Sequence, residues 1–166
     1  MIGRPAEPGR SGPLRLYLVA GEHSGDALGA KLMAEIGARL GGDVSFRGVG
    51  GELMEAEGLT SLFPLAEVAV MGPLNILRQL PRLVGRVTET ARDAIAARPD
   101  AVVIIDSPEF THPIAKRIRK RLPSIPIIDY VSPSVWAWRP GRARRMTHYV
   151  DHVLALLPFE PAAMKR

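Results

Sequence analysis

The chain has 166 residues, of which 46% are hydrophobic, and it contains no cysteine. This length and composition suit one domain with a substantial core, and they exclude disulfides, thiolate metal sites and thiol nucleophiles. The net charge of +5 includes two basic segments, Lys116–Arg121 and Arg139–Arg145, and no apolar run is long enough to span a bilayer.

Strands and helices are predicted to alternate along the chain. Residues 1–13 lack the apolar core of a secretory signal and are predicted to form a disordered tail, which leaves residues 14–166 for the domain. Apolar and β-branched runs predict strands at 14–20, 44–49, 101–105, 125–131 and 152–157, with a weak strand near 62–63. Helical spacing predicts helices at 26–40, 80–95, 111–122 and 142–149, and a short helix between the glycines at 51 and 58.

This alternation predicts an α/β fold, a Rossmann-like parallel sheet with right-handed crossovers and helices on both faces. Ligands of such sheets bind beyond the carboxyl ends of the strands. That rule selects four loops, at residues 21–26, 48–51, 106–110 and 132–141.

The first of these loops, GEHSGD, holds two carboxylates where a helix is predicted to begin. Negative side chains there disfavour an anion such as pyrophosphate, whereas their oxygens suit the hydroxyls of a sugar or another polyol. The candidate substrate-binding residues are Glu22, Ser24, Gly25 and Asp26, with glycine allowing close backbone approach. The alternative is that Glu22 and Asp26 only cap the helix. The glycine cluster at 48–51 could approach a phosphate, but by itself it is a weak signal.

Asp106 directly follows the most hydrophobic strand. A carboxylate in this position can remove a proton from a substrate hydroxyl as a general base, which makes Asp106 the catalytic candidate. The alternative is an Asx turn that organises Ser107 and Pro108. Glu109 is either a second acid or an exposed loop residue.

The loop SPSVWAWRPG contains both tryptophans of the chain. Aromatic faces stack on sugar or base rings, and an arginine can pair with a phosphate. Ser132, Ser134, Trp136 and Arg139 are therefore further substrate-binding candidates, although a tryptophan can instead fill the underside of the loop. The four histidines show no metal-ligand spacing, so neither a metal nor another cofactor is predicted.

Residues 68–86 have more apolar side chains than one buried face needs, with arginines interleaved at helical spacing. Pro73 and Pro81 are expected to break this run into a loop and two helical pieces. Such a segment can lie in a membrane interface, or it can pack into the core, which is the expectation for the stripe after Leu80. The candidate membrane-contacting or acyl-binding residues are Val70, Met71, Leu74, Ile76, Leu77 and Leu80.

The basic segment Lys116–Arg121 suits nucleic acid, an anionic lipid or simply water. We expect a solvated helix face, because Ile118 and Leu122 lie four residues apart on one side.

The segments LVAGEHSGD, GVGG, LAEVAVMG, IDSPEF, YVSPSVWAWR and VLALLPFE follow one another as they do in lipid-A-disaccharide synthases. The chain resembles this family from Leu14 to its last residue. The resemblance implies the N-terminal, acceptor-binding domain of a two-domain GT-B glycosyltransferase. It also implies Asp106 as the base, Glu22–Asp26 as part of the substrate site, and Val70–Leu77 as an apolar patch that takes acyl chains.

The resemblance further implies the reaction and its place. The family joins UDP-2,3-diacylglucosamine to 2,3-diacylglucosamine 1-phosphate with inversion, releases UDP and needs no metal ion. It acts in lipopolysaccharide synthesis as a peripheral protein on the cytoplasmic face of the inner membrane, and a homo-oligomer is compatible with this role. Because the family's chains are much longer, we expect Arg166 to be a truncation point and the fragment alone to be inactive. Thr111 stands where many relatives have Asn.

Two other functions remain open at this stage. A sugar-nucleotide epimerase of the same two-domain plan needs no apolar patch, so dependence on acyl chains distinguishes it from the transferase. A non-catalytic, basic nucleic-acid-binding module predicts strongly salt-dependent binding and no role for Asp106. The SPSVWAWR loop argues against this module, because groove recognition has no need for such a combination.

Overall fold

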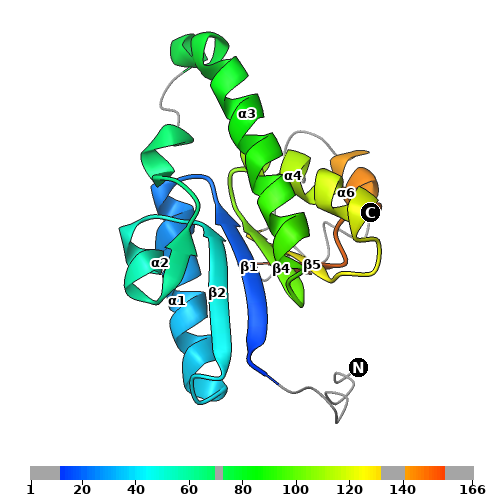
Figure 1. Ribbon diagram of the computed structural model, residues 1–166. Helices are drawn as coiled ribbons and strands as arrows, with labels where there is room; N and C mark the ends of the chain where they lie inside the picture. Colours follow the sequence, from blue (N-terminus) through cyan, green and yellow to red (C-terminus); the bar gives the residue numbers. More distant parts are fainter. Residues whose placement is uncertain (1–11, 70–72, 132–140, 156–166) are drawn as a thin grey trace.

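The computed structural model describes residues 12–69, 73–131 and 141–155, and the side chains of residues 73–79 and 141–143 are not described. One sheet of six parallel strands, in the order β3-β2-β1-β4-β5-β6, forms its centre (Figure 1). The strands are β1 Leu14–Ala20, β2 Val44–Val49, β3 Leu59–Ser61, β4 Ala101–Ile105, β5 Ile127–Tyr130 and β6 His152–Leu154. The helices are α1 His23–Arg39, α2 Glu52–Ala56, the 3-10 turn η1 Leu65–Glu67, α3 Pro73–Ala97, α4 Pro108–Arg121 and α6 Gly141–Met146.

The direction of strand addition reverses between β1 and β4, which are neighbours in the sheet. Ala20 at the end of β1 lies beside Ile105 at the end of β4. The loops that follow these two strands therefore leave the sheet side by side, at the point where ligands of doubly wound sheets bind.

Helices cover both faces of the sheet, as the sequence predicts (Figure 1). Leu16 and Leu18 of β1 face one core with Met33 of α1 and Met54 of α2. Tyr17 and Val19 point the opposite way, into a second core with residues of α3 and α4. Because successive side chains of a strand alternate between the two faces, a strand covered on both sides is apolar throughout.

The predicted bounds of β1, β2 and β4 are confirmed, whereas several other elements begin elsewhere. The third strand lies at Leu59–Ser61, just before the predicted position. Helix α1 begins at His23 rather than Asp26, and α4 begins at Pro108 rather than Thr111. Proline at a first helical position loses no intrahelical hydrogen bond, so Pro108 starts α4 without penalty.

Helix α3 corrects the expectation that prolines divide residues 73–95. Pro73 is its first residue, and Pro81 lies inside one continuous helix. Pro81 is exposed, and α3 continues through it although proline cannot donate a backbone hydrogen bond. The core-facing side of the described part starts at Leu83 and continues through Val87 and Ala91, whereas Val84, which was expected in the buried stripe, is half exposed.

The first turns of α3 extend beyond the carboxyl edge of the sheet (Figure 1). Leu80, in this projecting part, is 47% exposed. Within the described ranges, no helix combines the length and apolarity that crossing a bilayer requires.

Candidate active site

Two carboxylates and a hydroxyl meet where β1 and β4 end; we call Glu22, Ser24 and Asp106 the switch-point cluster. The Ser24 hydroxyl donates a hydrogen bond of 3.3 Å to Oδ2 of Asp106. The pKa of the Glu22 carboxyl is raised, first by partial burial and then by the hydrogen bond to Asp106 and the charge of Asp106; the Ser24 hydroxyl lowers it. Glu22 and Ser24 are exposed and Asp106 is half-buried, so a ligand can reach all three.

Asp106 lies in a tight turn that uses only one of its carboxylate oxygens. The backbone of Asp106 and Ser107 is left-handed at both residues, with φ of 52° and 44°. Oδ1 of Asp106 accepts the N–H of the next residue, Ser107, at 2.8 Å, one residue short of the bond that defines an Asx turn, while Oδ2 faces Ser24. The carboxylate therefore organises the start of its own turn, and the catalytic role of Asp106 stays a prediction. Left-handed conformations of residues other than glycine cost roughly 1–3 kcal/mol each and concentrate at functional sites.

Two glycines allow close contacts between the segments around the ends of β1 and β4. A Cβ atom on Gly21 would lie 2.5 Å from Cβ and Oγ of Ser107. A Cβ atom on Gly25 would lie 3.2 Å from the carbonyl oxygen of Ile105. Gly25 is buried, and its missing side chain serves the contact of α1 with β4. The sequence pointed to close ligand approach at Gly25, and the structure gives the position a packing reason.

Asp26 faces away from the switch-point cluster and binds the backbone at the start of α2. Its carboxylate accepts the N–H groups of Gly51 at 2.8 Å, Leu53 at 3.2 Å and Met54 at 3.0 Å. The side chain is 3% exposed. The predicted capping role is thus realised on α2 rather than on α1. Because Asp26 occupies the Gly51 N–H, this group of the glycine cluster is not available to a phosphate.

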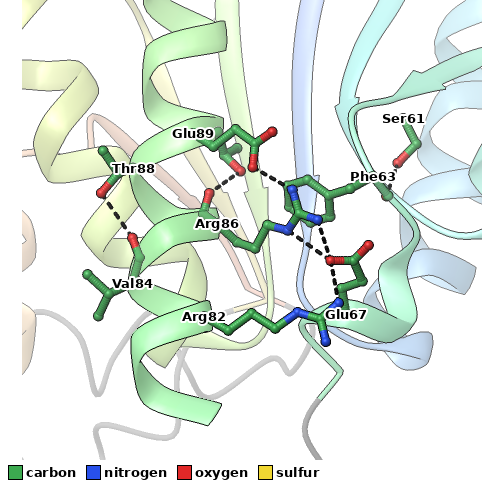
Figure 2. A network of polar contacts seen from close by, with 9 residues as sticks. Ser61, Phe63, Glu67, Arg82, Val84, Arg86, Thr88 and Glu89 are labelled. Carbon is green, nitrogen blue, oxygen red and sulfur yellow. Dashed lines mark hydrogen bonds and ion pairs between the residues drawn. The ribbon is translucent and has the colours of Figure 1, made fainter.

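A charged network fixes the segment after β3 to helix α3, as Figure 2 shows. Glu67 accepts hydrogen bonds from Arg82 at 2.8 Å and from Nε of Arg86 at 2.9 Å. Arg86 also pairs with Glu89 at 2.6 Å and lies over the ring of Phe63, 4.4 Å from its centroid. The two arginines hold the pKa of Glu67 below its usual value. Arg82 and Arg86 belong to the interleaved arginines that the sequence allowed at a membrane interface, and in the structure both pair with Glu67.

The remaining predicted site residues divide by location. Ser132, Ser134, Trp136, Arg139, Val70 and Met71 lie outside the described residues. Leu74, Ile76 and Leu77 lie on the projecting end of α3, and their side chains are not described. Leu80 is the member of the apolar set whose exposure is known.

The basic segment of α4 is a solvated helix face. Ile118 is buried, and Leu122 packs against the same core, as predicted. Arg119 pairs with Asp151, and Lys116 lies over the ring of Tyr149. Over the described ranges, no three acidic or histidine side chains gather in a way that could hold a metal ion.

Two features near the site escaped the sequence reasoning. The Thr111 hydroxyl donates to the carbonyl oxygen of Asp106 at 2.8 Å. Next to it, the buried His112 contacts the Tyr149 hydroxyl through Nδ1 at 2.8 Å and Asp129 through Nε2 at 3.5 Å. His112, Tyr149 and Asp129 come from separate parts of the fold, so their spacing in the sequence does not predict their contact. For Thr111, a threonine five residues after a strand-end aspartate was the available signal.

The strand order defines a Rossmann-like α/β domain, and the polar cluster at the reversal of strand order is its candidate ligand site at the carboxyl edge of the sheet. The sequence model of the lipid-A-disaccharide synthetase family, LpxB, matches residues 16–166. The chain belongs to this family, which confirms the resemblance drawn from its motifs.

Its relatives include three lipid-A-disaccharide synthases. The chain is 58% identical to that of Nitrobacter hamburgensis over 152 residues, which are 92% of this chain and 38% of the relative. It is 58% identical to that of Rhodopseudomonas palustris strain CGA009 over 151 residues, 91% of this chain and 38% of the relative. It is 51% identical to that of Ruegeria pomeroyi over an alignment of 168 positions, gaps included, which covers 98% of this chain and 41% of the relative. The chain thus spans about two fifths of the length of these curated relatives.

Proposed function

We propose that this chain forms the acceptor-binding part of an inverting glycosyltransferase of lipid A synthesis. The enzyme transfers 2,3-diacylglucosamine from its UDP derivative to 2,3-diacylglucosamine 1-phosphate and releases UDP. Family membership supports this reaction. The observation that carries the proposal for this chain is the meeting of Asp106 with Ser24 and Glu22 at the reversal of strand order.

In the proposed reaction, Asp106 accepts the proton of the acceptor hydroxyl while that oxygen attacks the anomeric carbon of the UDP-sugar. Oδ2 is the oxygen suited to this role, because Oδ1 already accepts the Ser107 N–H. Ser24 and Glu22 orient hydroxyls of the acceptor, and holding the reactants in place supplies much of the rate. The charge that develops on UDP needs cationic or N–H donors, which an acidic cluster does not provide.

We test this role by comparing Asp106→Asn with Asp43→Asn. Both substitutions are made in the whole protein that the natural gene encodes. Asp43 is exposed in the turn before β2 and serves as the matched control. We expect Asp106→Asn to lower kcat by roughly 10²–10⁴-fold, as loss of a general base does, with UDP-sugar binding nearly unchanged. Turnover that survives this substitution at the level of the Asp43 variant excludes Asp106 as the base.

We also propose that the projecting end of α3 and residues 70–72 hold acyl chains at the cytoplasmic face of the inner membrane. The exposure of Leu80 and the apolar residues that precede it in the sequence, Val70, Met71, Leu74, Ile76 and Leu77, support this role. Leu80→Ser should weaken sedimentation with anionic vesicles. Leu40→Ser is the matched control, because Leu40 is 43% exposed and ends α1 at the opposite edge of the sheet. Equal sedimentation of the two variants contradicts a membrane role for α3.

The two alternative functions make different predictions for the same variants. An epimerase would act equally on substrates with and without acyl chains. A nucleic-acid-binding module would retain its activity in Asp106→Asn. Neither alternative accounts for membership of the lipid-A-disaccharide synthetase family.

A further inference from the structure

The turn that presents the Asp106 carboxylate is held at both of its ends. On one side, the Asp106 N–H donates to the carbonyl oxygen of Tyr130 at 3.1 Å, which extends the pairing of β4 with β5 by one residue. On the other side, the carbonyl oxygen of Asp106 accepts the Thr111 hydroxyl at 2.8 Å. Between these bonds, the left-handed backbone of Asp106 and Ser107 aims Oδ2 at Ser24.

The hydroxyl of Thr111 has one hydrogen and two carbonyl oxygens within reach. It lies 2.8 Å from the oxygen of Asp106 and 3.1 Å from that of Ser107. The Ser107 oxygen already accepts the N–H groups of Phe110 and Thr111, each at 3.0 Å. The Thr111 hydroxyl therefore donates its hydrogen to the carbonyl oxygen of Asp106. Thr111 is fully buried, so water cannot replace it.

We propose that Thr111 is a positioning residue for Asp106. Without the hydroxyl, the Asp106 carbonyl loses the donor that keeps the left-handed turn in place, and the backbone can relax toward an ordinary conformation. That relaxation moves the carboxylate away from Ser24 and Glu22. The inference rests on the proposed function only where it predicts catalysis; the geometry of the turn is testable without it.

The chain offers a matched control for a structural role. Thr90, in α3, is also fully buried, and its hydroxyl donates at 2.8 Å to the carbonyl oxygen of Arg86, four residues earlier. A threonine that bonds back within its own helix is common. Thr111 differs because its hydroxyl donates to Asp106, which lies outside α4, before the helix begins. Thr90→Val and Thr111→Val remove the same group from equally buried sites.

The experiment compares Thr111→Val, Thr111→Ser and Thr90→Val for kcat, KM and urea unfolding. We expect Thr111→Val to lower kcat by about 10- to 100-fold, with each KM within about threefold of wild type, because a small displacement of a catalytic group has effects of this size. Thr111→Ser should restore kcat to within about threefold of wild type. Thr90→Val should lose stability but keep its kcat. If Thr111→Ser is no better than Thr111→Val, or if Thr90→Val loses kcat equally, the proposal is wrong.

A second measurement separates this proposal from the proposed reaction. Amide hydrogen exchange measures the protection of the Ser107 N–H, which donates a hydrogen bond to the Asp106 side chain. We expect Thr111→Val to lose this protection and Thr90→Val to keep it, whatever reaction the protein catalyses. Unchanged protection in Thr111→Val overturns the positioning role, whereas a wild-type protein without transferase activity overturns the proposed function alone. If Thr111→Val does not fold, Thr111→Cys against Thr111→Ser makes the same comparison, because cysteine and serine differ only in sulfur against oxygen and the thiol donates weakly.

Discussion

Asp26 provides the sharpest test of which strand-end carboxylates bind substrate and which hold the fold. Its side chain is buried and satisfies three N–H groups at the start of α2. Replacing it with alanine leaves three partly or fully buried donors without this acceptor, at about 1 kcal/mol each. Asp26→Ala should therefore lower the free energy of unfolding by about 3 kcal/mol. For a domain of this size, that corresponds to a loss of roughly 6–12 °C in Tm.

Asp26→Asn refines the argument because it keeps the shape of the side chain. Its amide oxygen can replace Oδ1, which accepts the N–H groups of Gly51 and Met54. Its NH₂ group would then face the Leu53 N–H, so one bond becomes a contact between two donors. We expect a loss of about 1–2 kcal/mol, measured by urea unfolding followed by circular dichroism.

The control for both variants is Glu35→Ala, an exposed residue of α1 that pairs with Arg39. Its loss should stay within about 0.5 kcal/mol. In the transferase assay, the Asp26 variants should keep the KM of wild type at temperatures where they are folded. Wild-type stability together with a raised KM would refute the structural assignment and make Asp26 a substrate ligand.

Two further predictions concern Glu22 of the switch-point cluster and Gly21, the residue before it. Because the pKa of Glu22 is raised, the unfolded chain loses the proton first, and the free energy of unfolding falls as the pH rises above about 4.3. Glu22→Gln should therefore raise the urea midpoint at neutral pH and leave it unchanged below about pH 4. An equal shift of the midpoint at the two pH values would contradict the raised pKa of Glu22. Gly21→Ala brings a Cβ atom against Ser107, so it should lower kcat by about tenfold or more, with wild-type kcat as the contrary result. Gly85→Ala, where a Cβ meets nothing within 4 Å, should instead add about 0.5–1 kcal/mol of stability with no change in kcat.

The strands were predictable because their burial on both faces leaves a continuous apolar run. The bounds of β1, β2 and β4 agree with the sequence for this reason. The starts of α1 and α4 were missed by three residues each, because His23–Gly25 of the first site loop and Pro108–Glu109 show no apolar helical periodicity. Ser24 consequently lies in the first turn of a helix rather than in a loop. Pro81 led to the opposite error, because its low helix propensity predicts a break, whereas α3 continues through this residue.

Within the site, the sequence could pair Asp106 with Ser24 because both follow strands that a doubly wound sheet places side by side. It could not separate Asp26 from Glu22, which are both acidic residues of one short segment. Their roles differ because Asp26 points toward residues 51–54, a contact that depends on tertiary structure alone. The same limit applies to His112, whose partners come from β5 and from the segment after α6.

The distribution of charge at the carboxyl edge constrains how an acceptor with a phosphate can bind. Asp26 accepts three N–H donors, and the pKa of Glu22 is raised first by burial and then by its hydrogen bond to Asp106 and the charge of Asp106, so a second negative charge beside Asp106 is disfavoured. A phosphate placed there would add a third, whereas a sugar hydroxyl donates to the same oxygens without repulsion. Arg82 and Arg86 are paired with Glu67. We therefore expect the acceptor to enter with its reacting hydroxyl toward Asp106 and its phosphate directed away from the switch-point cluster.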